Sequence, residues 1–421
     1  MTNHFNYLRA TDFDRAWLNF ELDLPLEAGT NGKPNPFYIT RPGDPIAELI
    51  DGLLSPFYKP PKFFFSGHRG CGKSTELLHL MANPQIQKKF WPVVFSIRDE
   101  ADIIDLDFRD VLLAMGGRMF LEFRKQGGVL PSKLMKDLES WRGRVEEEVT
   151  TVKEGKYSNM EVGAGLEAFF ANASLKMRME PKTRRQIRQV IDKNVTGLID
   201  VINSIAGAVQ ARDGRIPLIL IDDLDKPGLK EAKSIFQERR EIMLQPNCAI
   251  VYTVSSALFY SKEFDAIRDQ AMFLPNVMLH PHRLPEQYVK EGYETMKLFV
   301  SKRMESRLIE PQALLLAITY SGGVFREMAR IMRTAIGRAR RRNADQVDKT
   351  DVEWAATEIR NEYRRILEKE DIAVLRNFYK NNHMQSSERI RPLLQLLALL
   401  EYKNGENWFD VHPVLKAVLN D

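Results

Sequence analysis

Residues 67–75 combine the residue types that hold a chain of phosphates. They read Gly-His-Arg-Gly-Cys-Gly-Lys-Ser-Thr and fit the spacing G-x-x-x-x-G-K-[ST]. Glycines in such a loop let backbone N–H groups converge on an anion, and the N-terminus of a following helix adds positive partial charge. At this spacing Lys73 would reach the β- and γ-phosphates, and the Ser74 hydroxyl would be a ligand of Mg²⁺.

The segments on either side of this loop are the ones that the motif requires. Residues 62–66 are Lys-Phe-Phe-Phe-Ser, which predicts a short buried strand, and residues 76–81 carry the apolar spacing of a helix. A strand that turns sharply into a helix through a glycine loop forms a cradle for phosphate. We therefore expect residues 67–75 to bind a nucleotide.

A group of acidic residues follows a second buried strand. Residues 216–221 are a continuous apolar run, typical of a central parallel strand that is covered on both faces. Asp222, Asp223 and Asp225 come directly after it. Because ligands of open α/β sheets bind at the carboxyl edge of the strands, these carboxylates should lie beside the phosphate loop. We expect Asp222 to hold Mg²⁺ and Asp223 to lie near the attacking water.

Length and composition limit the class of protein. The chain has 421 residues, of which 44% are apolar and 28% charged, as expected for a soluble globular protein of two or three domains. It has no run of about 18 apolar residues that would predict a membrane span, and its N-terminus lacks the pattern of a signal peptide. Two cysteines favour a reducing, cytoplasmic location, and a net charge of +4 does not by itself indicate nucleic acid.

Further apolar segments complete an α/β pattern. We expect three more strands, at residues 91–97, 247–256 and 273–279. Two helices are expected between these strands, one at 107–126 that is interrupted at Gly116–Gly117 and one long helix at 183–208. Residues 127–180 are expected to be an insertion. Beyond about residue 285 the pattern is mainly helical.

The last part of the chain, residues 345–421, is expected to form a winged-helix-like module. Two strand-like segments, 399–402 and 408–411, flank a turn that contains Asn404-Gly405, a strong signal for a hairpin. A module that reads DNA would need a basic recognition helix, and residues 387–391 are only mildly basic. We prefer a role in packing on the core and gating it, with DNA reading as the alternative.

With these motifs in place, the chain resembles the P-loop ATPases of the AAA+ and STAND groups, and within them the bacterial STAND-type or initiator-like ATPases, relatives of origin-recognition proteins. The resemblance is carried by residues 67–77, 218–226 and 321–327. It implies an α/β fold with a P-loop NTPase core built on a five-stranded parallel sheet, an α-helical lid and a C-terminal winged-helix-like domain. The expected divisions are 1–36 (lead-in), 37–284 (core, with the insertion at about 127–180), 285–343 (lid) and 345–421 (winged-helix-like domain).

The resemblance also implies roles for single residues. Arg326 would act as sensor 2 and point at the γ-phosphate, and Thr253 or Ser255 would act as sensor 1. Arg239 and Arg240 fall where a trans-acting arginine finger often lies, although surface arginines on an amphipathic helix explain them equally well. The expected nucleotide-binding residues are Tyr38 and Ile39 at the adenine, Gly67, His68, Arg69, Gly70, Cys71, Gly72, Lys73, Ser74 and Thr75 at the phosphates, and Thr253 and Ser255, with Ser74 and Asp222 as Mg²⁺ ligands and Lys73, Asp222, Asp223 and Arg326 as the catalytic set.

Three functions are compatible with these residues. The first is an ATP-binding and ATP-hydrolysing switch or assembly ATPase that self-associates or acts with a partner effector protein, in a bacterial phage-defence or mobile-element system. Asp223 stands where many AAA+ enzymes have glutamate, which favours slow turnover. The second is a DNA-binding initiator or loader that clamps DNA with its winged-helix-like module and the basic cluster 338–342. This cluster is otherwise a solvated helix end. The third is a scaffold that binds nucleotide without turnover.

Overall fold

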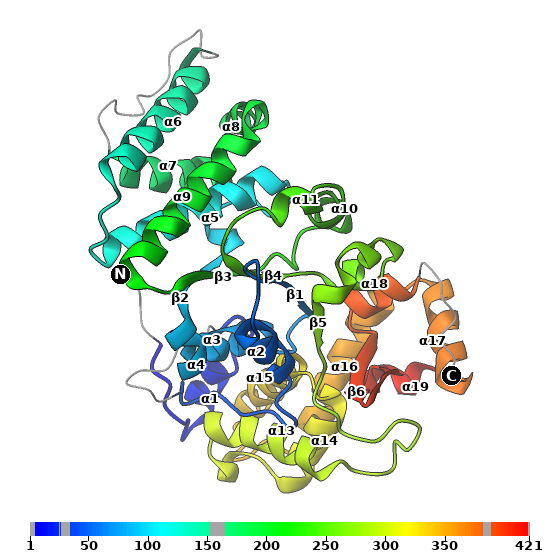
Figure 1. Ribbon diagram of the computed structural model, residues 1–421. Helices are drawn as coiled ribbons and strands as arrows, with labels where there is room; N and C mark the ends of the chain where they lie inside the picture. Colours follow the sequence, from blue (N-terminus) through cyan, green and yellow to red (C-terminus); the bar gives the residue numbers. More distant parts are fainter. Residues whose placement is uncertain (1–4, 25, 27–33, 152–164, 382–388, 420–421) are drawn as a thin grey trace. The chain divides into compact units, whose positions relative to one another are not determined.

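The computed structural model describes residues 5–24, 26, 34–151, 165–381 and 389–419 (Figure 1). The chain divides into two compact units. We name the first the lid unit only because it contains residues 285–343, the expected lid; it comprises Met1–Glu48, Gly67–Ala82 and Phe273–Asp421. The second, the sheet unit, comprises Leu49–Ser66 and Asn83–Met272. Within the described part of the chain, none of the helices has the length and apolar character needed to cross a membrane.

Five strands form one sheet with the order β2-β3-β4-β1-β5. They are β1 (Lys62–Gly67), β2 (Phe90–Ser96), β3 (Ile216–Asp222), β4 (Ala249–Thr253) and β5 (Ala271–Leu274). The pairs β2–β3, β3–β4 and β4–β1 are parallel, with Ser96 opposite Asp222 and Phe65 opposite Thr253. Since β3 and β4 are buried and mostly apolar, helices can cover both of their faces. The expected five-stranded parallel sheet is confirmed.

The last strand of the sheet is shorter than expected and begins earlier in the sequence. We expected residues 273–279, whereas β5 ends at Leu274 and is followed by Pro275, which has no N–H to donate. The next two N–H groups bond outside the sheet, that of Asn276 to the Glu401 carbonyl and that of Val277 to the Gly323 carbonyl. The strand therefore ends because its next backbone N–H groups donate to carbonyls far along the chain.

The helices of the sheet unit differ from expectation at two places. Helix α5 continues through Gly116–Gly117, where the expected interruption is wrong. A Cβ on Gly116 would come within 3.2 Å of Ile202, and one on Gly117 within 3.0 Å of Phe170, so the glycines allow close helix packing. The expected helix 183–208 is two helices, α8 (Pro181–Lys193) and α9 (Val195–Asp213), because Asn194 leaves the helical conformation and its side chain caps α9 at the Gly197 N–H.

The helices of the sheet unit are α2 (Ala47–Leu54, which begins at the boundary), α4 (Pro84–Lys89), α5 (Phe108–Lys125), α6 (Ser132–Thr151), α7 (Leu166–Met179), α8, α9, α10 (Leu229–Lys233), α11 (Arg240–Met243) and α12 (Ser256–Phe259).

The segment expected as an insertion, residues 127–180, contributes α6 and α7 to the sheet unit. Phe169 and Phe170 of α7 are buried in the same apolar core as Ile219 and Ile221 of β3. Residues 152–164 of this segment, including part of its glycine-containing stretch, lie outside the described residues. The described part is therefore continuous with the core of this unit.

The lid unit is mainly helical. Its one hairpin pairs β6 (Leu399–Asn404) with β7 (Glu406–Val411) in the described residues, and Gly405 takes the positive φ of 74° that the turn needs. The expected hairpin is confirmed, and it follows helices as expected, while the winged-helix assignment and the domain boundaries stay predictions. The helices of this unit are α1 (Phe13–Asn19), α3 (Lys73–Ala82), α13 (Lys290–Arg303), α14 (Pro311–Ser321), α15 (Phe325–Arg341), α16 (Lys349–Ile366), α17 (Lys369–Asn381), α18 (Ile390–Gln395) and α19 (Lys416–Leu419).

Candidate nucleotide site

The phosphate loop joins the end of β1 to the start of α3. β1 ends at Gly67 and α3 begins at Lys73, so the strand, loop and helix occur in the expected order. Gly70 has a φ of 80°, and a Cβ there would come within 2.2 Å of the Arg326 Cβ. Only glycine fits this position without strain. Ser74 and Thr75 lie in the first turn of α3, and Ser74 is exposed, as is Arg69 in the loop.

Lys73 is turned onto the carbonyls of its own loop. Its Nζ donates to the Gly67 carbonyl at 2.8 Å and to the His68 carbonyl at 3.0 Å, and the residue is buried. A lysine that contacts phosphates uses the same ammonium hydrogens. Because the ammonium has three hydrogens, a Lys73 that contacts both the β- and γ-phosphates has to release at least one of the two loop carbonyls.

The His68 side chain contacts the C-terminal part of the lid unit. Its Nε2 accepts a hydrogen bond from the Glu401 N–H at 2.8 Å, and Nδ1 lies 3.2 Å from the Leu394 carbonyl. Because a carbonyl can only accept, Nδ1 carries the proton and the ring is the neutral tautomer. Burial and then the nearby Lys73 charge lower the pKa of His68 from 6.5 to about 3. Only the backbone of His68 remains available for a phosphate.

The segment expected at the adenine packs against α3. Tyr38 and Ile39 are buried, and the Tyr38 ring stacks on the exposed His79 with centroids 4.5 Å apart. The Tyr38 hydroxyl donates to the Glu76 carboxylate at 3.5 Å, and burial raises the pKa of both groups. The structure thus brings Tyr38 to the helix that carries Lys73 and Ser74.

Sequence reasoning missed Arg41. This buried arginine donates through Nη1 to the Cys71 carbonyl of the phosphate loop at 3.1 Å and through Nη2 to the Pro275 carbonyl. Burial lowers its pKa. Its partners are carbonyls 30 and 234 positions away in sequence, which no local pattern indicates.

Arg326 reaches the phosphate loop through its backbone. Its N–H donates to the Gly70 carbonyl at 3.2 Å, which places the start of α15 against the loop. Its guanidinium instead pairs with Asp23, Nη2 lying 2.9 Å from Oδ1. An arginine that senses a γ-phosphate must release such a carboxylate first.

The other arginines of α15 are also paired within the chain. Arg330 pairs with Glu362, and Arg333 pairs with Glu21. In the basic cluster expected as a DNA contact or a solvated helix end, the partners are Asp351 for Arg338, Asp14 for Arg340, and Asp348 and Asp351 for Arg342, while Arg341 lies over the Trp354 ring. These contacts leave little unbalanced positive charge on the helix.

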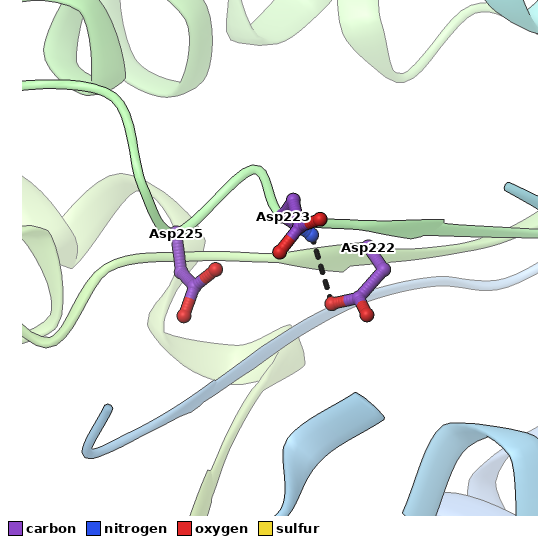
Figure 2. A group of neighbouring side chains, drawn as sticks. All are labelled: Asp222, Asp223 and Asp225. Carbon is purple, nitrogen blue, oxygen red and sulfur yellow. Dashed lines mark hydrogen bonds between the residues drawn. The ribbon is translucent and has the colours of Figure 1, made fainter. Parts of the chain in front are cut away.

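The acidic end of β3 forms a cluster of three carboxylates (Figure 2). Asp222, Asp223 and Asp225 each place one carboxylate oxygen within 4.8 Å of those of the other two. All three residues are half-buried. Oxygen donors of this kind suit Mg²⁺. The backbone of Asp223 has a φ of 65°, and its N–H donates to Asp222 Oδ1 at 2.8 Å.

Asp223 is engaged at both carboxylate oxygens. The Ser96 hydroxyl at the end of β2 donates to Oδ2 at 2.6 Å, and Lys226 Nζ lies 2.7 Å from Oδ1. A carboxylate that orients a water must have a lone pair directed at that water. In this arrangement each oxygen of Asp223 already has a neighbouring side chain as a partner, and these partners compete with a water for the carboxylate.

Thr253 and Ser255, expected at the γ-phosphate, use their hydroxyls on nearby backbone. Thr253 Oγ1 donates to the Ile221 carbonyl at 3.1 Å and accepts from the Leu224 N–H at 2.9 Å, so it fixes the turn that carries the acidic residues. Ser255 caps α12 by accepting from the Leu258 N–H. Of the two expected finger arginines, Arg239 lies over the Phe108 ring and Arg240 pairs with Glu241.

The expected site residues thus form two clusters, one in each unit. The lid unit holds Tyr38, Ile39, the phosphate loop and Arg326, and the sheet unit holds the acidic end of β3 with Thr253 and Ser255. The first cluster supplies a glycine loop at a helix start, a lysine and a hydroxyl, which fit phosphates. The second supplies carboxylates, which fit a cation such as Mg²⁺.

Comparison with known proteins gives structural neighbours only. No family model matches this sequence, and no curated protein matches it either. The ORC2 protein of Aeropyrum pernix in its ADP form is similar over 97% of this chain and 96% of its own, with 12% identity and a TM-score of 0.43. Cdc6p of Pyrobaculum aerophilum covers 91% and 96%, with 10% identity and a TM-score of 0.41. The A. pernix ORC1 protein in complex with DNA covers 93% and 95%, with 13% identity and a TM-score of 0.39. At such low identities and TM-scores the likeness decides nothing about activity or ligand, which have to be inferred from this chain's own residues.

Proposed function

We propose that this chain is an ATP-binding and ATP-hydrolysing switch of the P-loop ATPase class. The observation that carries the proposal is the glycine loop between β1 and α3, which has Lys73 at the helix start and no room for a side chain at Gly70. The three carboxylates at the end of β3 support a site for the accompanying Mg²⁺.

Each cluster has its own task in this proposal. Backbone N–H groups of residues 67–75 and the N-terminus of α3 hold the phosphates, and Lys73 neutralises the β- and γ-phosphate charge. Ser74 and Asp222 are the Mg²⁺ ligands, and the ion would balance phosphate charge and orient the phosphates. Tyr38 and Ile39 form the side of the site that contacts adenine.

The contacts of Asp223 and Arg326 support slow turnover. Asp223, the residue proposed to orient water, is held by Ser96 and Lys226. Arg326, the residue proposed to sense the γ-phosphate, is paired with Asp23. Arg326 has to release Asp23 before it contacts the γ-phosphate, and the partners of Asp223 compete with the attacking water. These contacts distinguish a resting state from an active state. This is the behaviour of a switch rather than of a fast motor.

The test measures binding and turnover separately. Binding of a fluorescent ATP analogue is followed with and without Mg²⁺, and phosphate release is followed with ATP. We expect Lys73→Ala to weaken binding, and Asp222→Asn to lower phosphate release, each by roughly 100-fold or more, as for other lost charge-stabilising contacts. Lys230→Ala, which removes an exposed lysine of α10, is the charge-matched control. Binding without phosphate release in the unaltered protein would leave the scaffold function instead.

A DNA-binding initiator or loader is the second candidate. The structural neighbours are ORC and Cdc6 proteins, one of them in complex with DNA, so this alternative agrees with them better than the phage-defence or mobile-element setting, which none of the three comparisons supports. The internal pairing of the arginines at 338–342 argues against that cluster as the DNA contact. Duplex DNA binding that weakens steeply with added salt and raises phosphate release would favour the initiator.

Self-association and a partner protein are part of the same proposal. Light scattering after size-exclusion chromatography, with no nucleotide, with ADP and with a non-hydrolysable ATP analogue, measures whether nucleotide changes the oligomer. An oligomer formed only with the ATP analogue would support a trans-acting arginine, for which Arg239 and Arg240 are the candidates. An assembly state that ignores nucleotide, together with no partner bound in the ATP state, would count against a switch.

A further inference from the structure

One side chain of the phosphate loop is held by the C-terminal hairpin. His68 directly follows the last residue of β1, yet its ring is fully buried and hydrogen-bonded at both nitrogens to residues more than 300 positions away. Phe273 packs edge-on against the ring, with centroids 5.7 Å apart. A buried ring with both nitrogens satisfied has one orientation, because any rotation would leave a buried polar atom unpaired.

The backbone of the same residue holds Lys73. The carbonyls of Gly67 and His68 accept from Lys73 Nζ, so the conformation of these two residues determines whether the lysine stays on the loop. When Lys73 moves to the β- and γ-phosphates, at least one of these carbonyls loses that partner. We therefore expect the backbone of the loop to change conformation at His68, the residue whose ring is fixed on the hairpin.

The hairpin residue that meets His68 is itself tightly held on its other side. The Glu401 carbonyl accepts from the Asn276 N–H at 3.3 Å and from Asn276 Nδ2 at 3.1 Å. On the next residue, the Tyr402 hydroxyl donates to the Gly322 carbonyl at 2.7 Å, close to the start of α15. The backbone at Glu401 is therefore fixed between the phosphate loop and the segment that follows β5.

The docked hairpin also contains an unfavourable group. Glu401 is buried, and its Oε2 has no hydrogen-bond partner among the described residues. Burial raises the pKa of this carboxyl from 4.5 to about 8. A buried polar atom without a partner costs free energy, so the docked state is opposed by a term that undocking removes. Such opposing terms allow two states of similar free energy.

We propose that His68 is a positioning residue that couples occupancy of the phosphate loop to docking of the β6–β7 hairpin. The proposal rests on the proposed function and adds the route by which nucleotide state reaches the C-terminal part of the chain. Movement of Lys73 onto a phosphate changes the loop at Gly67 and His68, and the His68 ring transmits that change to the Glu401 N–H. By linkage, undocking of the hairpin changes nucleotide affinity by the same factor.

Hydrogen–deuterium exchange tests this coupling in the full-length protein. Exchange of peptides that cover residues 399–411 is measured without nucleotide and with saturating adenylyl imidodiphosphate and Mg²⁺, for the unaltered protein, His68→Leu, His68→Gln and Tyr402→Phe. We expect the nucleotide to change hairpin exchange by roughly tenfold in the unaltered protein, within the usual range of coupling between sites. In His68→Leu, which removes both ring hydrogen bonds, this response should disappear. In His68→Gln, whose amide keeps an acceptor for the Glu401 N–H, part of it should return.

Tyr402→Phe separates coupling from loosening of the hairpin. It removes one buried hydrogen bond of β6 without touching the phosphate loop, so it should raise exchange in the absence of nucleotide and keep the nucleotide response. A full response in saturated His68→Leu would overturn the coupling. If His68→Leu does not fold, His68→Gln carries the test. A response smaller than that of the unaltered protein supports the coupling, and a response equal to it overturns the coupling.

The outcomes also distinguish this proposal from the proposed function. The same samples are assayed for binding of the analogue. An unaltered protein that binds the analogue and shows no change at residues 399–411 would overturn the coupling and leave the ATP switch in place. An unaltered protein that binds no analogue would overturn both.

Discussion

The phosphate loop and the acidic end of β3 are held in place by different kinds of contact. The loop's partners come from far along the chain, namely His68 to Glu401, Cys71 to Arg41 and Gly70 to Arg326. The acidic end is held by the ends of neighbouring strands and by its own turn, through Ser96, Thr253 and Lys226. A loop held by distant segments responds to their movement, whereas a turn held by its own sheet does not. The comparison suggests that regulation acts on the phosphate loop and that the acidic end sets the resting rate.

The largest effect is expected at the crowded glycine of the phosphate loop. Gly70→Ala places a Cβ within 2.2 Å of the Arg326 Cβ, at a φ of 80°. We expect it to destabilise the folded protein by about 3 kcal/mol or more and to remove nucleotide binding, because overpacking and left-handed strain add. The matched control is Gly207→Ala in α9, where a Cβ has nothing within 4 Å and helix propensity should add up to about 1 kcal/mol. Thermal unfolding and analogue binding measure both, and similar behaviour of the two variants would contradict the tight contact between α15 and the loop.

The hairpin that holds the loop should lose stability as pH rises. Burial raises the pKa of Glu401 from 4.5 to about 8, so the folded state keeps a proton that the unfolded chain has released. This contribution is complete below about pH 4.5 and is lost as pH rises through about 8, since stability falls with pH where the folded state binds more protons. Glu401→Gln is neutral at every pH, so its unfolding free energy should exceed that of the unaltered protein by about 1 kcal/mol or less at pH 5 and by up to roughly 4 kcal/mol at pH 8.5.

Urea unfolding at pH 5, 7 and 8.5 measures this difference. His68 does not add to this difference because both proteins contain it. Its pKa of about 3 in the folded state makes each protein more stable as pH rises through about 6.5, the value of the unfolded chain, and this contribution cancels. A difference in unfolding free energy that is the same at all three pH values would show that Glu401 is ionised in the folded state. The buried Glu401 would then no longer be evidence that docking of the hairpin is opposed by an unfavourable group.

A smaller effect is expected at the acidic end of β3. Lys226→Ala removes the ammonium that pairs with Asp223 Oδ1, which leaves that oxygen available to orient water. We expect phosphate release to rise a few-fold, a change in the activation free energy of about 1 kcal/mol or less. Lys230→Ala on the neighbouring helix is the control. A fall in phosphate release would mean that Lys226 assists the reaction, and the acidic end would no longer set the resting rate by holding Asp223.

The smallest effect is expected in the arginine cluster. Arg340 pairs with Asp14, and both side chains are largely exposed. Arg340→Ala should therefore change the unfolding free energy by about 1 kcal/mol or less. It should also leave duplex DNA binding, measured by fluorescence anisotropy at two salt concentrations, within about twofold of the unaltered protein. A clear loss of DNA affinity with a shallower salt dependence would instead favour the initiator function.

Some strands and turns could be predicted from short stretches of sequence. The apolar runs predicted β1, β2, β3 and β4, and Asn404-Gly405 predicted the β6–β7 hairpin, because strand and turn preferences depend on neighbouring residues. The spacing of glycines and Lys73 predicted a phosphate loop, which lies between strand and helix as expected. The residue roles at that loop stay predictions until the nucleotide experiments are done.

Other features depend on residues that meet only in the folded chain. Gly116–Gly117 suggested an interruption, but α5 is continuous, and these glycines let Phe170 and Ile202 pack closely on it. β5 ends early because residues 323 and 401 take the next backbone bonds. The position of His68 in the loop suggested a residue near phosphate, whereas its ring accepts a hydrogen bond from the Glu401 N–H of the hairpin, 333 positions further along.

The sequence by itself therefore determined the parts of the candidate site that need only a short stretch of chain, which are the glycine loop, the lysine at the helix start and the acidic residues after an apolar strand. The tertiary structure decided which side chains hold those parts, including Arg41, His68, Ser96 and Asp23. The physical reason is that loop and strand conformation follows from the residues next to one another, while burial and hydrogen bonding of a side chain depend on segments that only folding brings together.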